Sequence, residues 1–104
     1  MSVDISHGST QWGTETLSYS AFANMGRHLA HVLPASDWRA IRFLFDRKSD
    51  VVGLIGPQQA GVIADIFAKA AQHPKMPREL ADIVRRWAAA GYRAHGAGEM
   101  WSWS

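Results

Sequence analysis

Apolar residues recur at intervals of three and four along four stretches of the chain, the spacing that places them on one face of an α-helix. We expect helices over residues 18–33, from 36 or 37 to about 48, from 57 to the connector 73–77, and from 77 to about 95. Their buried faces are expected to contain Phe22, Met25, Leu29, Val32, Trp38, Ile41, Leu44, Phe45, Val62, Ile63, Ile66, Phe67, Ala70, Leu80, Ile83, Val84, Trp87 and Gly91. The apolar face of each helix must pack against another element to leave water, so the pattern predicts helices packed against one another.

Prolines, glycines and small polar residues mark the expected ends of these helices. Pro34 ends the first, because the residue before a proline is pushed out of helical geometry. Ser36 or Asp37 can cap the second by accepting backbone amide hydrogens. Gly96 and Gly98 are expected to end the fourth.

The two ends of the chain predict short strands. Residues 3–5 alternate apolar and polar, and the tail 99–104 alternates so that its two tryptophans share a face. We expect the two ends to pair into a small sheet, because a free tail would leave costly hydrophobes in water. The β-branched run 51–55 predicts another strand. The Ser-, Thr- and Gly-rich segment 6–16 predicts a loop.

Composition fits these elements and excludes several classes of protein. The 104 residues suit one globular domain, 1–104, with an α+β fold that is mostly helical: four amphipathic helices and a small sheet from the N- and C-terminal segments. The absence of cysteine excludes disulfides, thiolate nucleophiles and Cys-based zinc sites. No secretory signal and no apolar stretch of about 20 residues is visible, so we expect a cytoplasmic protein with no membrane association.

The chain contains histidines and serines that could act in catalysis or metal binding, but they do not form a recognisable catalytic or metal-binding motif. His28 and His31 lie three residues apart on a polar helix face, a spacing that can bind one metal ion. No HExxH pattern supplies a third ligand, so two solvated histidines near a helix C-terminus are expected. His7 lies beside Ser6 and Ser9, but no GxSxG motif is present. We therefore predict no catalytic, cofactor-binding or metal-binding residues and no cofactor.

Arginines on two predicted helices suggest a surface for phosphates. Residues 27–48 hold five basic and two acidic residues, an excess of +3 in a chain of net charge +2. The candidate nucleic-acid contacts are Arg39, Arg42, Arg85, Arg86 and Arg93. Asp82 lies within one turn of Arg85 and Arg86 and can pair with them. The face of the fourth helix also lacks the Asn and Gln that read base edges.

Five tryptophans are a heavy aromatic load for this length. Trp38 and Trp87 lie on apolar faces, whereas Trp12, Trp101 and Trp103 lie near the ends, where a small sheet could leave them exposed. Exposed Trp near Arg is typical of an interaction hot spot. The alternative is that these tryptophans are buried in a small hydrophobic core against the sheet.

The layout resembles that of a family of small uncharacterised domains of actinomycetes and their phages. The residues that carry the resemblance are Ile5-Ser-His-Gly8, Trp38, Pro57 with the Ala-rich helix after it, and Trp101-Ser-Trp103. The family has no assigned activity, so the resemblance implies a bacterial or phage setting inside the cell and no site residues.

These patterns favour a small non-enzymatic interaction or accessory protein that binds a protein partner or itself. The candidate partner-binding residues are Trp12, Arg39, Arg42, Phe43, Trp101 and Trp103. The alternative is a nucleic-acid-binding regulatory protein that uses its Arg-rich helix faces. A third hypothesis is an enzyme that uses His7 or the pair His28 and His31.

Overall fold

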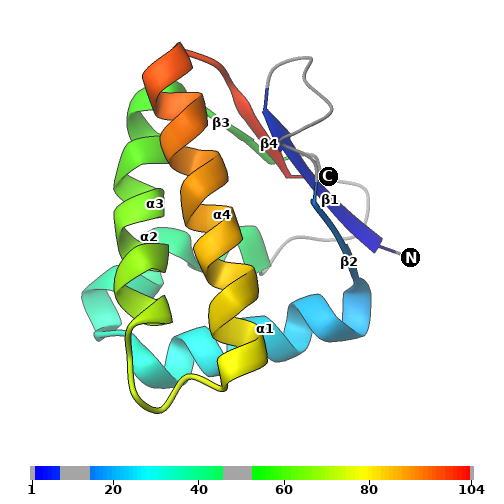
Figure 1. The fold of residues 1–104 in the computed structure, drawn as a ribbon, viewed down its shortest axis with the longest axis vertical. Helices are drawn as coiled ribbons and strands as arrows, with labels where there is room; N and C mark the ends of the chain where they lie inside the picture. The colour runs from blue at the N-terminus through cyan, green and yellow to red at the C-terminus, as the bar shows by residue number, and fades with distance from the viewer. Residues whose placement is uncertain (1, 8–14, 46–52, 104) are drawn as a thin grey trace.

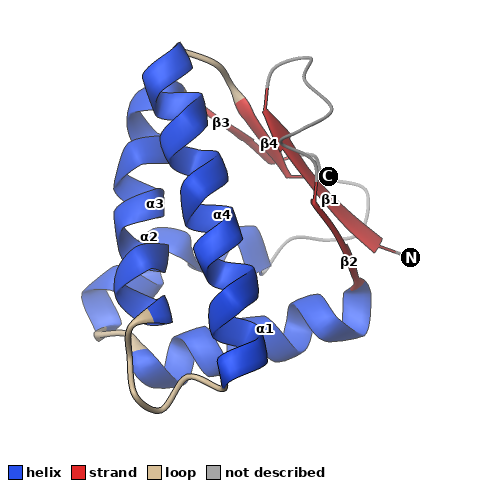
Figure 2. Cartoon of the chain, viewed as in Figure 1, coloured by secondary structure: helices blue, strands red, loops and turns tan. Residues whose placement is uncertain are grey.

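The computed structural model describes residues 2–7, 15–45 and 53–103, which form four helices and four strands (Figure 1). Their order is β1 (Ser2–His7), β2 (Glu15–Ser18), α1 (Tyr19–Val32), α2 (Ala35–Phe45), β3 (Gly53–Ile55), α3 (Pro57–Ala71), α4 (Arg78–Ala97) and β4 (Trp101–Trp103). The strands lie along one side of the molecule and the helices along the other (Figure 2). The expected α+β class, mostly helical, is confirmed.

Capping groups account for the ends of the first helix. The Ala21 amide donates to the hydroxyl of Ser18 at 3.3 Å, which satisfies one of the unpaired donors of the first turn. At the other end the Leu33 amide donates to the Leu29 carbonyl at 3.0 Å, and Pro34 follows. Helix α1 therefore begins and ends within one residue of its predicted bounds.

The second helix begins earlier than predicted. The Trp38 amide donates to the Pro34 carbonyl at 3.0 Å, so Ala35 is already helical. Ser36 and Asp37 consequently lie inside the first turn, and neither is the residue that precedes the helix. Asp37 still suits this place, because a carboxylate is favourable near the positive end of the helix dipole. The predicted continuation over 46–48 lies outside the described residues.

The third and fourth helices follow the proline and glycine signals, with one correction. Pro57 is the first residue of α3, where an amide hydrogen would have no hydrogen-bond partner within the helix, so its absence costs no hydrogen bond. Helix α4 passes through Gly96 and ends at Ala97, so the prediction that Gly96 ends it is wrong. Gly98 ends it, with a φ of 67° that favours glycine.

The four strands form one antiparallel sheet in the order β2-β1-β4-β3. Strand β4 pairs with β1 so that Trp103 faces Ile5 and Trp101 faces His7, which confirms the predicted pairing of the two ends. Strand β3 covers the described part of the predicted strand, and residues 51–52 lie outside the described residues.

The predicted loop over 6–16 is wrong at both of its ends. Strand β1 continues to His7, and β2 begins at Glu15. Glu15 and Thr16 lie opposite Ile5 and Asp4 in the sheet, so antiparallel pairing overrides the loop-like composition there. The part of the loop over 8–14 lies outside the described residues.

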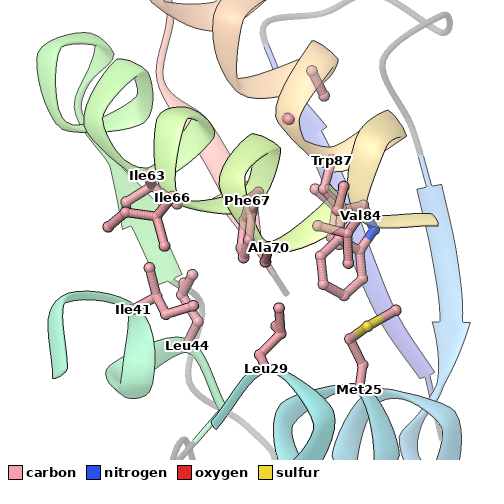
Figure 3. Close-up of a cluster of buried hydrophobic side chains, with 14 of the residues drawn as sticks. Met25, Leu29, Ile41, Leu44, Ile63, Ile66, Phe67, Ala70, Val84 and Trp87 are labelled. Atoms are coloured by element: carbon pink, nitrogen blue, oxygen red, sulfur yellow. The ribbon is translucent and has the colours of Figure 1, made fainter. Parts of the chain in front are cut away.

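Helices and sheet enclose one hydrophobic core (Figure 3). Met25 and Leu29 from α1 approach Phe67 from α3 and Trp87 from α4. The sheet adds Trp103, whose ring centroid lies 5.1 Å from that of Trp87 in an edge-to-face arrangement. These contacts join the N-terminal helices, the C-terminal helix and the last strand in a single packing unit.

One predicted core residue is exposed. Val62 on α3 is 58% exposed, whereas the neighbouring Ile63 is 1% exposed. Val62 shares its side of the helix with Asp65 and Lys69, because these residues follow it by three and seven positions. Trp38, Phe45, Leu80 and Ile83 are partly buried and pack against the core.

Candidate functional site

The terminal tryptophans are not available to a partner. Trp101 and Trp103 are both fully buried, since β4 lies between β1 and β3 and its two tryptophans pack in the core. Their assignment as partner-binding residues is therefore wrong, and the sealed small core is correct. Trp12 lies outside the described residues. Phe43 is 46% exposed on α2, as its position off the inner stripe predicts.

The candidate arginines are divided between two helices. Arg39 and Arg42 are exposed on α2, which packs against α1 and α3. Arg39 donates from Nε to the Ala35 carbonyl of its own helix at 3.3 Å. On α4, Arg85 pairs with Asp82 at 2.6 Å, the local pairing that the sequence predicts. Arg86 and Arg93 are exposed on the same helix.

Among the described residues, the histidines of the metal and enzyme hypotheses do not join acidic side chains in a cluster of three. His28 is partly buried and His31 is exposed on α1, while the side chain of His7 is not among those described. Within residues 2–7, 15–45 and 53–103 no three His, Asp or Glu side chains are arranged to hold a metal ion. In the same part of the chain, no helix has the length and apolar run that crossing a bilayer would require.

Close packing of α3 against α4 creates the most distinctive surface feature. A Cβ added to Gly61 would lie 2.9 Å from the ring of His95, and one added to Gly91 would lie 2.9 Å from the Cβ of Ala64. The absence of larger side chains at Gly61 and Gly91 lets the two helices approach. The helices run antiparallel, since residues early in α3 meet residues late in α4 (Figure 1).

Two hollows lie along the outer side of this helix pair. The first has a volume of about 210 Å³ and is lined by Gln58, Gly61, Val62, Asp65, Tyr92 and His95. The second has a volume of about 310 Å³ and is lined by Ala68, Gln72, Arg85, Ala88, Ala89 and Tyr92. Because Tyr92 lines both, we treat them as one feature, the α3–α4 groove.

Hydrogen bonds order the first hollow. The Tyr92 hydroxyl donates to Oδ1 of Asp65 at 2.5 Å, in the range of a charge-assisted bond. This hydrogen bond, followed by desolvation and the negative charge of Asp65, raises the pKa of Tyr92 above its ordinary value. Nδ1 of His95 lies 2.9 Å from the Pro57 carbonyl oxygen. Since a carbonyl only accepts, Nδ1 of His95 is the donor in this hydrogen bond.

Exposed hydrophobes single out this groove among the hollows. Val62 and Tyr92, which is 42% exposed, are two of the four large exposed hydrophobic side chains among the described residues, and both line the groove. A larger hollow of about 440 Å³ lies between α1 and the start of α4, but none of those four lines it. The hollow between α1 and α2 contains Trp38 and Phe45, which already pack against each other with their ring centroids 5.7 Å apart.

Sequence reasoning missed the groove residues Val62, Asp65, Tyr92 and His95. One signal was present: small residues recur on the facing sides of both helices, among them Gly61, Ala64, Ala88 and Gly91. Such a pattern predicts a close helix pair. It does not say which polar side chains will flank the contact, because Asp65 and Tyr92 are 27 positions apart.

Residues 8–104 match the model of a family described as "Domain of unknown function (DUF7739)". The match agrees with the resemblance to an uncharacterised family, while the actinomycete or phage setting stays a prediction. No curated protein and no solved structure matches the chain.

Proposed function

The chain belongs to the DUF7739 family, and since that description assigns no activity, we propose from the geometry of the chain that it is a small non-enzymatic interaction module. Its binding surface is the α3–α4 groove. The groove holds a protein segment that covers the exposed side chains of Val62 and Tyr92.

The gathering of apolar groups in one groove carries this proposal. Val62 and Tyr92 are exposed beside the small side chains of Ala68, Ala88 and Ala89. Covering apolar surface releases about 25 cal/mol for each Å² removed from water. A helix pair with a shallow groove suits a helical segment that presents apolar residues at spacings of three and four.

The hydrogen bond between Tyr92 and Asp65 supports a binding role. It holds the ring of an exposed tyrosine in one place before a partner arrives, so less conformational entropy is lost on binding. Tyrosine is also enriched at interface hot spots, because it offers a large rigid surface with a polar tip.

The same hydrogen bond argues against acid–base chemistry at Tyr92. The pKa of Tyr92 is raised, so its hydroxyl keeps its proton at neutral pH and acts as a donor. A general base would need a pKa shifted toward the working pH. Tyr92 therefore offers contact and orientation rather than acid–base chemistry.

Nucleic-acid binding remains the alternative proposal, through Arg39, Arg42, Arg85, Arg86 and Arg93. The ion pair of Arg85 with Asp82 weakens that alternative, since it offsets part of the positive charge of α4.

Site-specific photocrosslinking in cells that naturally produce the chain tests the proposal. A photoreactive phenylalanine derivative replaces Gln72, an exposed residue of the groove lining, and a matched variant carries it at Ala40, which is exposed on α2. We expect an adduct of higher mass that nuclease leaves intact from position 72 and much less from position 40. A nuclease-sensitive adduct would favour the nucleic-acid alternative. Equal labelling at both positions, or none at 72, would overturn the proposal.

A further inference from the structure

We infer that the segment bound in the α3–α4 groove is the same groove of a second copy of this chain, related by a two-fold axis near Ala89. This inference rests on the proposed function, because it takes the groove as the binding surface and names its occupant.

The charges along the groove are complementary to themselves. One end carries an acceptor, the Asp65 carboxylate, and the other end carries the Arg85 guanidinium. In an interface with two-fold symmetry, residue i contacts residue j of the second copy and j contacts i. Arg85 of each copy therefore meets Asp65 of the other, and both ends of the groove are satisfied at once.

The spacing of these groups fits a symmetric arrangement. Arg85 and Tyr92 are seven residues apart on α4, which is about 10 Å along the helix axis. Asp65 lies at the level of Tyr92, to which it is hydrogen-bonded at 2.5 Å. The midpoint between donor and acceptor falls at Ala88 and Ala89, so the axis passes through the smallest side chains of the surface.

Small side chains at the axis let two α4 helices pack closely. Ala89 is exposed and Ala88 is 4% exposed, so neither holds the second copy away. Val62 and Tyr92 then lie at the Asp65 end of each groove, where the second copy covers them. The exposed hydrophobes and the self-complementary charges are thus accounted for by one contact.

The charged groups retain capacity for this contact. Tyr92 occupies one acceptor position of the Asp65 carboxylate, which offers about four. Arg85 uses Nη1 toward Asp82, and its guanidinium has five N–H donors in all. The first hollow, of about 210 Å³, gives the incoming guanidinium a place beside Asp65.

The area available makes the dimer concentration-dependent. Helix α4 has 20 residues and is therefore about 30 Å long. Two helices side by side are about 20 Å wide, so each copy contributes roughly 600 Å², below the roughly 800 Å² per partner of a standard stable interface. We therefore expect monomer and dimer to exchange in the micromolar range.

Sedimentation velocity on the purified protein at low salt tests this inference. The mass should rise with concentration from 11.5 kDa toward twice that value. Arg85→Glu and Asp65→Arg should each weaken dimerisation roughly tenfold or more, because each puts like charges in contact. The double variant with both changes reverses the pair and should recover most of the affinity. Arg27→Glu makes the same charge change on α1, outside the groove, and should have little effect.

Ala89→Arg provides a second test of the dimer that leaves Arg85 and Asp65 unchanged. Ala89 is exposed, so the variant should keep its fold by circular dichroism and yet be monomeric. A wild-type protein that stays monomeric at millimolar concentration overturns the inference, as does a dimer that these variants leave unchanged or that the double reversal does not restore. If an adduct to a different protein then forms at position 72, the proposed function stands and only the identity of the occupant is wrong.

Discussion

Gly91 on α4 lies so close to Ala64 on α3 that a Cβ added to the glycine would stand 2.9 Å from the Ala64 Cβ. The Trp101 ring also lies close to this position, 3.0 Å from the added Cβ. Three elements, α3, α4 and β4, therefore meet at a position that has no room for a side chain.

Gly91→Ala should accordingly destabilise the protein by about 1–3 kcal/mol, because overpacking displaces α3 or the Trp101 ring. Urea denaturation followed by tryptophan fluorescence measures the change. Gly96→Ala is the matched control on the same helix, since nothing lies within 4 Å of its added Cβ. That variant should be neutral or more stable by up to about 1 kcal/mol, because alanine favours helix. Equal effects of the two changes would contradict the tight contact.

Trp101→Ala should cost about 3–5 kcal/mol, since it empties a fully buried site between the sheet and α3. This loss is a large fraction of the free energy of unfolding of a typical small domain, about 5–15 kcal/mol. Met100→Ala at the neighbouring position, 48% exposed, should change the free energy of unfolding by less than about 0.5 kcal/mol. Thermal unfolding of the two variants compares them directly, and similar melting temperatures would show that β4 is not part of the core.

Val62 and Ile63 offer a neighbouring pair on α3 with opposite expected behaviour. Ile63→Ala should cost about 2–5 kcal/mol, because the side chain is buried in the core. Val62→Ser should leave the free energy of unfolding within about 0.5 kcal/mol of the wild type while weakening self-association. Urea denaturation and sedimentation on the same samples separate the two effects. A large loss of stability for Val62→Ser would mean that this residue is part of the core.

Tyr92 should ionise at a higher pH than an ordinary tyrosine, because its hydroxyl donates to Asp65. Absorbance at about 295 nm, which reports the phenolate, can be compared between the wild type and Tyr92→Phe to isolate Tyr92 from the other tyrosine. Asp65→Asn should lower the pKa of Tyr92 toward its usual 10.0, since the carboxylate charge is removed. An unchanged titration in this variant would contradict the link.

The same shift has a defined sign for stability. The folded-state pKa of Tyr92 is raised, so the folded protein holds this proton more tightly than the unfolded chain. The associated stabilisation is fully present below the ordinary pKa of 10.0 and is lost as the pH rises through the folded-state pKa. Tyr92→Phe should therefore lose less stability than the wild type between neutral pH and strongly alkaline pH.

The approximate positions of the helices and most of their inner faces were predictable because they depend on local chemistry. Phe22, Met25 and Leu29 repeat with the period of the helix. Pro57 marks a helix start because it lacks an amide hydrogen, and Gly98 marks a helix end because glycine readily adopts a positive φ. The pairing of β1 with β4 was also predictable, since alternation in both terminal segments predicts strands, and a strand needs a partner for its backbone hydrogen bonds.

The groove was decided only by tertiary structure. Val62 and Ile63 are adjacent and both apolar, and only the packing of α3 against α4 determines which of them faces the core. The period of a helix shows which residues share a face, but it does not show how far around the helix the buried face extends. Trp101 and Trp103 likewise share a face in any extended tail, and they are buried because helices from the middle of the chain cover that face.

Amino-acid order by itself thus determined where helices and terminal strands form, because hydrophobic period, prolines and glycines act within a few residues. It did not determine which polar side chains meet at the surface. Asp65 and Tyr92 are 27 positions apart, and their hydrogen bond exists because small residues let two helices approach closely. Contacts between distant segments depend on the distance and rotation of whole helices, which no short stretch of sequence specifies.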